Sequence, residues 1–415
     1  MNNTLSTLTW LFSGLMFALC ISIPDGYRIG AGGLLLLSLS LFFLKPKWSM
    51  LNKDDRLLFW VFVVFVISIY GAALSDWIRF DSVVKKTLDR FSLFIFVLPV
   101  MVLLLNVSGR KEWLWYGVVI GAMSGFSLAL YERLVLGLGR ARGSENAILF
   151  GNISMLLGFL SLTAAAYFFY QKRFFWLVLA LSGGVCGIGG SVLSGSRGGW
   201  VAAPLVIFFL LWVFRNLLGK KLLSKLILFL LLIISIIVLV PQTGVQARIG
   251  QAVSNITHYA DNTAKETSVG LRFDMWKAAV YMFQQNPIIG FGESQVKKNK
   301  QNLADIGSVS HKIVRFHHAH NEFLDAASKR GLIGLFFILV LYLVPLKLFM
   351  NKIRQNECDW KIKFYAVAGA LVPMSYIGFG FTNVMFTQKI GVIMYAFSIV
   401  LFWVAVKNAE NEALS

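Results

Sequence analysis

Hydrophobic runs recur from one end of the chain to the other and are separated by polar loops. Most runs are about 17–22 residues long, and an α-helix of that length crosses a hydrocarbon core of about 30 Å. Backbone groups in lipid must be hydrogen-bonded within their own segment, and the alternation typical of membrane strands is absent, so the spans are predicted to be α-helices. The second and eighth spans are short, so we expect them to extend into flanking residues or to be broken. Twelve spans are predicted, at residues 5–22, 29–44, 57–75, 90–107, 114–133, 148–170, 174–193, 200–214, 226–241, 332–350, 364–381 and 390–407.

Composition supports the same fold class. Of the 415 residues, 57% are hydrophobic and only 14% are charged. About a quarter of the residues of a soluble domain are charged, so the chain is predicted to be an all-α polytopic membrane protein. The first run lacks a basic leader and a small-residue cleavage site, which indicates a retained helix. Cys20, Cys186 and Cys358 have no motif partner, so no disulfide framework or metal site of cysteines is expected.

The charges in the loops predict an orientation. Short loops rich in Lys and Arg lie at 45–56, 109–113, 171–173, 215–225 and 351–363, and such loops are typically cytoplasmic. An even number of spans then places both termini in the cytoplasm. The net charge of +19 would suggest nucleic acid in a soluble protein, but here much of it follows from topology, and no nucleic-acid partner is expected. The outward loops are predicted at 23–28, 76–89, 134–147, 194–199, 242–331 and 381–389.

Several cations nevertheless lie in the predicted outward loops, against the topology rule. An anionic partner on that side would explain them, and so would pairing with nearby carboxylates (Asp76, Asp81, Asp89 and Glu145) or with lipid headgroups. These cations are Arg79, Lys85, Lys86, Arg90, Arg140, Arg142, Arg197, Arg272 and Arg315.

The long outward loop divides the chain into residues 1–241, 242–331 and 332–415. Its apolar spacing predicts helices over Gln246–Ala260 and Gly270–Gln285, joined by a linker over 261–270. The second helix is amphipathic, and Asn286-Pro287 is expected to end it before a turn at 288–292. A last helix is predicted from about Phe316 to Lys329-Arg330-Gly331. The apolar face of the second helix is Leu271, Met275, Ala278, Ala279 and Met282. A loop this long inside a membrane protein is usually functional.

Two arginines are candidates for binding an anion. Arg197 lies in SGSRGGW (194–200) between two spans, where small residues permit a close backbone approach to a ligand. Placing an arginine at the membrane edge costs free energy, which makes a functional role for it a reasonable expectation. Arg272 lies in the first turn of a predicted helix, the end at which anions bind. A snorkelling arginine in a turn and a solvated arginine are the structural alternatives.

Three histidines occur in HHAHNE, at His317, His318 and His320. If the segment is helical, His317 shares a face with Asn321, and His318 shares one with Glu322. Three interpretations remain open: a metal site of His318, His320 and Glu322, structural histidines at a helix start, and a general base that takes a hydroxyl proton. The sequence offers no HExxH pattern and no second ligand cluster in support of the metal site.

Four short stretches and the layout around them resemble the bacterial O-antigen ligases, within the O-antigen ligase/polymerase superfamily. The stretches are SGSRGGW (194–200), GLRFDMW (270–276), NPIIGFG (286–292) and HAHNEFLDAASKRGLIGL (318–335). The resemblance implies a glycosyltransferase fold of the GT-C-like type, with about twelve spans and one large periplasmic helical loop. It also implies an inner-membrane protein with the active site on the periplasmic face.

The resemblance implies transfer of O-antigen polysaccharide from undecaprenyl pyrophosphate to a sugar hydroxyl of lipid A-core, with inversion and without metal or cofactor. His320 would be the catalytic residue, and Arg197 and Arg272 would bind the pyrophosphate. Two arginines can stabilise a departing pyrophosphate in place of a metal ion. Further candidates for supporting roles are His318, Asn321, Glu322, His317, Arg315 and Arg142.

Other functions remain open at this stage. An O-antigen polymerase or a ligase that moves glycans onto protein uses the same donor and differs only in the acceptor. A transporter or lipid flippase also fits many spans and a positive charge, but it predicts ionisable groups or broken helices near the bilayer midplane and an inverted repeat, and no convincing repeat is found.

Overall fold

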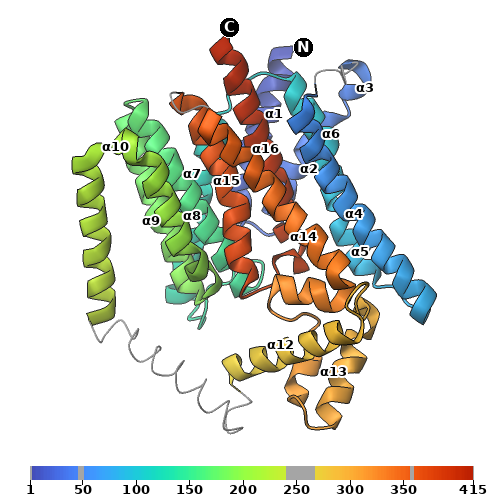
Figure 1. Ribbon diagram of the computed structural model, residues 1–415. Helices are drawn as coiled ribbons and strands as arrows, with labels where there is room; N and C mark the ends of the chain where they lie inside the picture. The colour runs from blue at the N-terminus through green and yellow to red at the C-terminus, as the bar shows by residue number, and fades with distance from the viewer. Residues whose placement is uncertain (1, 45–50, 240–266, 356–358, 415) are drawn as a thin grey trace. The chain divides into compact units, whose positions relative to one another are not determined.

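The computed structural model describes residues 2–44, 51–239, 267–355 and 359–414, and every regular element in these ranges is a helix (Figure 1). The predicted helix at 246–260 and most of the linker at 261–270 lie outside the described residues. The long helices are α1 (Asn2–Leu19), α2 (Gly26–Ser38), α4 (Lys53–Phe80), α6 (Leu93–Asn106), α7 (Trp113–Leu130), α8 (Ala147–Tyr170), α9 (Phe174–Ser194), α10 (Gly198–Leu239), α12 (Ser268–Gln285), α13 (Val296–Asp305), α14 (Glu322–Gln355), α15 (Trp360–Gly380) and α16 (Lys389–Leu414). Shorter elements are α3 (Leu41–Leu44), α5 (Lys85–Phe91), a π-helical turn (Tyr131–Val135) and 3₁₀ turns at Glu293–Gln295, His311–Arg315 and Met385–Thr387.

Ten helical segments of the described chain are long and apolar enough to cross a membrane, which confirms a polytopic membrane protein. They coincide with ten of the twelve predicted spans. The first predicted span corresponds to α1, whose opening turns are rich in Asn, Thr and Ser, and it is not among the ten. The ninth falls in the part of α10 that follows a break at Gly219. The short second span is indeed broken, between α2 and α3.

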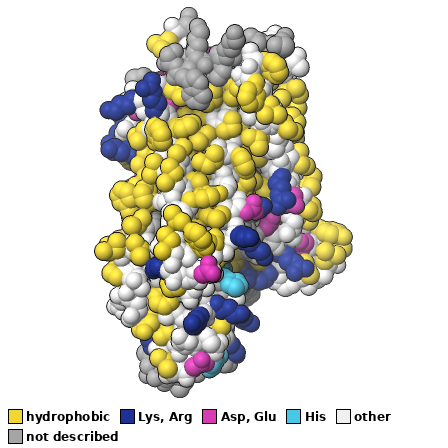
Figure 2. Space-filling model, turned by 90° about the vertical axis from the view of Figure 1, so that its right-hand side faces the viewer, with side chains coloured by type: hydrophobic (Ala, Val, Ile, Leu, Met, Phe, Trp, Pro, Cys, Tyr) yellow, Lys and Arg dark blue, Asp and Glu magenta, His cyan; other side chains and the backbone are white. Residues whose placement is uncertain are grey.

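The chain forms two compact units, which we describe separately. The first unit comprises residues 1–73, 84–206 and 336–415, and the second comprises residues 74–83 and 207–335. In the first unit, α8 packs along α9, α1 along α7 and α15 along α16. Almost every residue in the apolar stretches of α15 and α16 is buried. Hydrophobic side chains cover most of the face shown in Figure 2, as expected for helices exposed to lipid.

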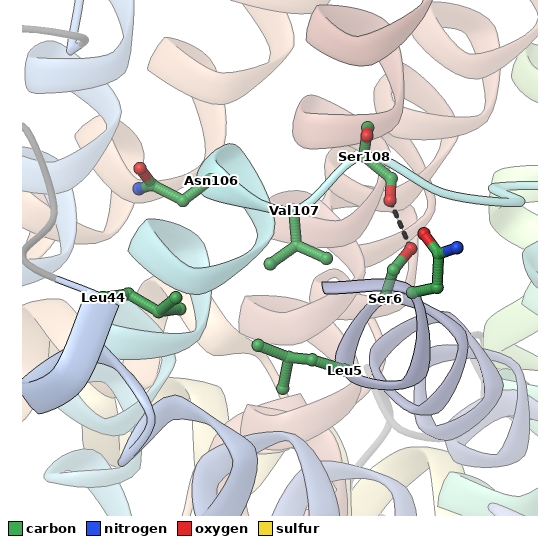
Figure 3. Close-up of a pocket in the computed structure, with 7 residues that line it drawn as sticks. Leu5, Ser6, Leu44, Asn106, Val107 and Ser108 are labelled. Carbon is green, nitrogen blue, oxygen red and sulfur yellow. Dashed lines mark hydrogen bonds between the residues drawn. The ribbon is translucent and has the colours of Figure 1, made fainter. Parts of the chain in front are cut away.

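Contacts within the first unit gather one set of predicted loops, together with both chain termini, at one end. Ser6 of α1 donates a hydrogen bond to the Ser108 carbonyl beside a small pocket that Leu44 also lines (Figure 3). Lys111 forms an ion pair with Glu412 near the C-terminus. The Trp403 indole donates to Asp55 over 2.8 Å. These contacts join the loops that the sequence predicts to be cytoplasmic.

Within the first unit, pairs of loops from the other predicted set are in contact. Arg90 donates to the Thr387 carbonyl over 2.7 Å, and Lys389 lies 2.7 Å from Asp89. The Arg140 guanidinium donates to the Ser194 carbonyl over 2.7 Å. In the first unit, each of these contacts therefore joins segments of the same predicted set.

The second unit is built on α12, α13 and the 3₁₀ turn at His311–Arg315. All five apolar residues predicted on one face of the 270–285 helix are buried, which confirms the amphipathic assignment. All of them except Ala279 form a cluster with Val296, Leu303 and Ala304 of α13 and with Ile313. The sequence interpretation assigned no element to α13.

The start of the last helix was predicted wrongly. Helix α14 begins at Glu322 and not near Phe316, because the Asn321 carboxamide oxygen accepts hydrogen bonds from the backbone N–H groups of Phe323 and Leu324 and so caps the helix. The predicted helix end at Lys329-Arg330-Gly331 is confirmed by a break at Gly331, whose φ of 64° is left-handed.

Candidate functional site

The histidine-rich segment forms an ordered turn that precedes α14. His320 has a φ of 52°, a left-handed conformation that costs a non-glycine residue about 1–2 kcal/mol. Its backbone N–H donates to His318 Nδ1 over 3.3 Å, and the two imidazole rings lie 4.2 Å apart between centroids. The Phe316 ring contacts the other side of His320, at 5.5 Å. The helical faces that the sequence suggested for these histidines therefore do not exist.

Two buried charges hold the backbone of this turn. Lys300 of α13 is 1% exposed, and its ammonium donates to the carbonyls of Phe316 over 2.7 Å and His318 over 3.4 Å. Asp325 of α14 accepts a hydrogen bond from the backbone N–H of Ala319 over 2.9 Å. Hydrogen bonds to charged groups are stronger than neutral ones, so the two side chains fix the peptide groups around His320.

Asp325 is in turn part of a buried ion-pair chain. Lys329 lies one helical turn further along α14 and forms a 2.8 Å ion pair with Asp325 and a 3.5 Å ion pair with Glu293. The side chains of Asp325 and Lys329 are only 7% exposed. A buried carboxylate with no partner would be very unfavourable, so Lys329 stabilises the charge that Asp325 presents to the turn.

The environment makes His318 and His320 chemically different. Burial, together with the charges of His320, Lys329 and Lys300, lowers the pKa of His318 to about 3, and the charge of Asp325 opposes this shift. His318 is therefore neutral at neutral pH, and its Nδ1 atom is an acceptor because it receives the His320 N–H. His318 is thus unsuited to take up a proton near pH 7. His317 is exposed, and Arg315 lies over the Phe316 ring with its guanidinium carbon 4.8 Å from the centroid.

Two of the quoted stretches interlock through their backbones. Phe291 and Gly292 donate to the carbonyls of Ser328 and Lys329 at the end of the first part of α14, over 2.9 and 3.1 Å. In the other direction, Leu332 donates to the Pro287 carbonyl over 2.7 Å. These bonds satisfy carbonyls that a helix end leaves without a partner. The NPIIGFG segment therefore serves as the C-terminal cap of the helix that begins at the histidine turn.

Arg272 lies in the predicted helix but not in its first turn, because α12 begins at Ser268, two residues earlier than predicted, and Arg272 is its fifth residue. Thr267 caps the helix by accepting from the Gly270 N–H over 3.1 Å, and the Arg272 side chain is half-buried. Asp274, two residues on, is buried and accepts from the Ser310 N–H over 2.8 Å. Ser310 precedes the 3₁₀ turn that leads to Phe316, so α12 is fixed to the segment that carries the histidines.

Arg197 belongs to the first unit, in the turn between α9 and α10, and its side chain is exposed. Gly195 ends α9 in a left-handed conformation with a φ of 62°. Beside it, Arg140 binds the Ser194 carbonyl, and a surface hollow lined by Arg140, Arg142 and Glu145 follows. The structure therefore brings three of the four stretches together in the second unit and places the fourth in the first unit.

The part of the chain that the structure describes contains no group of three or more His, Cys, Asp or Glu side chains that could hold a metal ion. Asn321 and Glu322 are both buried, and the Asn321 oxygen is occupied by the helix cap. The metal-site interpretation of the histidines therefore gains no support from these residues.

Sequence analysis missed Lys300, Asp325 and Glu293. A signal for Lys300 was present, because it falls on the same helical face as Val296, Leu303 and Ala304 and should be buried with them. Asp325 lay within a quoted stretch without an assigned role. Nothing in the local sequence indicated its bond to the Ala319 N–H, because that bond requires the turn to fold back on the helix.

The fold and these contacts define a multi-pass helical membrane protein. Its second unit contains a histidine turn whose backbone is bonded to the buried charges of Lys300 and Asp325. Residues 182–339 match the family model described as O-Antigen ligase, and Arg197, Arg272 and His320 all lie within this region. An O-antigen ligase of Escherichia coli is 24% identical over 357 residues, covering 82% of this chain and 78% of that protein. An uncharacterised protein of Haemophilus influenzae is 26% identical over 395 residues, covering 95% of this chain and 97% of its own length.

Proposed function

We propose that the protein is an O-antigen ligase of the bacterial inner membrane. In this proposal it transfers O-antigen polysaccharide from undecaprenyl pyrophosphate to a sugar hydroxyl of lipid A-core, on the periplasmic face, during lipopolysaccharide biosynthesis. The observation that carries the proposal is the turn at His318–His320, which Lys300 and Asp325 hold within the region that matches the O-antigen ligase family model. Both termini and the Lys- and Arg-rich loops are then cytoplasmic.

His320 is the proposed general base. It deprotonates the acceptor hydroxyl, the oxygen attacks the anomeric carbon, and the bond to the pyrophosphate breaks on the opposite face, so the anomeric centre inverts. The strained φ of His320 supports the assignment, because left-handed non-glycine residues are concentrated at functional sites. The neutral His318 ring beside it adds no positive charge that would oppose protonation of His320.

Arg197 and Arg272 are the proposed pyrophosphate ligands. Departure of the polyprenyl pyrophosphate requires stabilisation of negative charge, and guanidinium groups supply fixed donors without losing their proton. The exposed Arg197 and the half-buried Arg272 are suited to this role. The exposed Arg142 and Arg315 are proposed to bind anionic sugars of the acceptor. The mechanism proposed here requires no metal ion.

The decisive experiment complements a null strain with single variants and compares lipopolysaccharide banding. We expect His320→Ala to lower ligation about 10²- to 10⁴-fold, the usual contribution of a general base, with normal membrane expression. His317→Ala is the matched control, because this neighbour is exposed and should leave ligation unchanged. Full ligation by His320→Ala would contradict the assignment of His320 as the general base.

The arginines are tested with purified protein, both lipid substrates and excess EDTA. Arg197→Ala and Arg272→Ala should each lower transfer about 10²- to 10³-fold, the size of the loss when one donor to a developing anion is removed. Lys298→Ala, which removes an exposed cation of α13 in the same unit, is the control and should leave transfer unchanged. Transfer that stops in EDTA and resumes with added metal would contradict the mechanism proposed here.

An O-antigen polymerase and a protein O-oligosaccharyltransferase are the alternatives, because both use the same donor. In the null strain, a ligase defect leaves polyprenyl-linked polymer accumulating without ligated polymer. A polymerase defect leaves lipid A-core that carries a single repeat unit. If lipopolysaccharide is unchanged and glycan is lost from protein, the protein is an O-oligosaccharyltransferase.

A further inference from the structure

The turn at Pro287–Ile289 combines an exposed apolar surface with a backbone that is bonded to other protein segments. The side chains of Ile288 and Ile289 are 64% and 40% exposed. Surface turns usually carry polar side chains and leave their carbonyls to water. Here the carbonyls of Asn286, Pro287 and Ile288 accept from the N–H groups of Gly290, Leu332 and Ile333. Three carbonyls of the turn are therefore bonded within the protein, as an apolar medium requires of backbone polar groups.

Two membrane helices fix the position of this turn. On one side, Leu332 and Ile333 belong to α14, a candidate membrane span, and their side chains are 52% and 44% exposed. On the other side, the end of α4 is joined to the segment after the turn. Arg79 donates to the Gly290 carbonyl over 3.0 Å, and Asp76 accepts from the Glu293 N–H over 2.8 Å.

The end of α4 has the composition of a membrane boundary. Trp77 and Ile78 are 55% and 73% exposed, and Phe80 is 37% exposed. Tryptophan is enriched where a span meets the headgroup region, and the Arg79–Asp76 ion pair lies among these residues. The turn and the residue after it are therefore bonded to the end of α4 through Arg79 and to α14 through Leu332, the residue that follows the break at Gly331.

We propose that Pro287–Ile289 dips into the outer leaflet of the bilayer and anchors the second unit to it. The occupant of this surface is lipid, because the exposed isoleucines continue the lipid-facing surface of α14 through Leu332 and Ile333. The anchor is attached directly to the helix that carries Asn321 and Asp325. It therefore fixes the depth of the histidine turn relative to the membrane, whatever reaction the turn performs.

The test uses spin labels on the full-length protein in lipid vesicles. Cys20, Cys186 and Cys358 are replaced by serine, and single cysteines are introduced by Ile288→Cys and Ile289→Cys. Ile306→Cys is the matched control, because Ile306 is 76% exposed at the end of α13 in the same unit. Ile67→Cys, 60% exposed within α4, supplies the reference for lipid.

Labels at 288 and 289 should collide with oxygen as readily as the label at 67. They should also collide several-fold less with a water-soluble nickel chelate than the label at 306. Access of the chelate equal to that at 306 would overturn the proposal. Low access to both reagents would also overturn it, because the surface would then be covered by protein and not by lipid. Quenching of a fluorophore at 289 by brominated lipid, with none at 306, is the second measurement.

Discussion

At the scale of single residues, Lys300 shows how a buried charge shapes the site from a distance. Its ammonium contacts the backbone of the histidine turn but no histidine ring in the described contacts. Burial lowers its pKa to about 8, the neighbouring Asp325 opposes this shift, and Lys329 adds to it. Lys300 is therefore a positioning residue whose charge disappears within an accessible pH range.

Lys300→Met should lower transfer about 10- to 100-fold, because two hydrogen bonds from a charged donor are removed. In the wild type the ammonium is present below pH 8 and is lost as the pH rises through about 8, so transfer should fall on the alkaline side. The pH profile of Lys300→Arg should lack this fall, because a guanidinium does not lose its proton. An alkaline fall that persists in both variants would contradict the role of Lys300.

The titration of His318, unlike that of Lys300, should not affect activity near neutral pH. Its pKa of about 3 means that protonation of this ring cannot cause any change in activity between pH 5 and 8. His318→Gln keeps a polar side chain beside His320 and should leave the acid side of the pH profile in place. The acid side of that profile is measured with saturating lipid substrates. Its disappearance in His318→Gln would show that the titrating group was His318.

At the scale of elements, the histidine turn and the NPIIGFG segment both depend on the first part of α14. Asn321 caps its start, and the backbone of Phe291 and Gly292 caps its end. Gly331 terminates the helix with a φ of 64°, and a Cβ there would lie 2.3 Å from the Ile288 carbonyl oxygen. Glycine is therefore required at position 331 for two reasons: its φ is positive, and there is no space for a Cβ.

Gly331→Ala tests this element. The left-handed φ adds about 1–2 kcal/mol, and the clash adds about 1–3 kcal/mol, so unfolding in detergent should occur at a clearly lower temperature. Gly307→Ala is the matched control, because Gly307 has a φ of 70° but no atom within 4 Å of the added Cβ. Equal shifts for the two variants would show that the close approach to Ile288 is unimportant.

Much of the element scale was predictable, and the exceptions have a physical pattern. The amphipathic helix α12, its end at Asn286 and the break at Gly331 follow from local periodicity and from glycine and proline. The start of α14 was predicted wrongly because Phe316–His320 contains no strong helix breaker. The turn there is imposed by Lys300 and Asp325, whose contacts with it do not follow from the local sequence of the turn.

At the scale of the whole molecule, the first unit has two ends with different loops. The N-terminal helix, the 106–113 loop and the C-terminus meet through Ser6–Ser108 and Lys111–Glu412. Both termini therefore lie at one end of this unit, as an even number of spans requires. In Figure 1 the N and C labels stand close together above the bundle of α1 and α16.

Cysteine labelling tests the orientation of these ends. In a cysteine-free background, Asn3→Cys and Glu412→Cys should resist a membrane-impermeant maleimide in intact spheroplasts and react after permeabilisation. Ser144→Cys, exposed in the predicted outward loop 134–147, should react in intact spheroplasts. Labelling of the two termini without permeabilisation would invert the proposed topology.

The sequence alone determined that the chain is a helical membrane protein and which short stretches resemble a ligase. These features are local, because hydropathy, charge and the glycine and proline positions act within a few residues. Only the tertiary structure decided that His318 is neutral, that His320 is strained, and that Lys300 and Asp325 hold the turn between them. Those properties depend on burial and on contacts between residues that are distant in the sequence, and they arise only when α13 and α14 pack together.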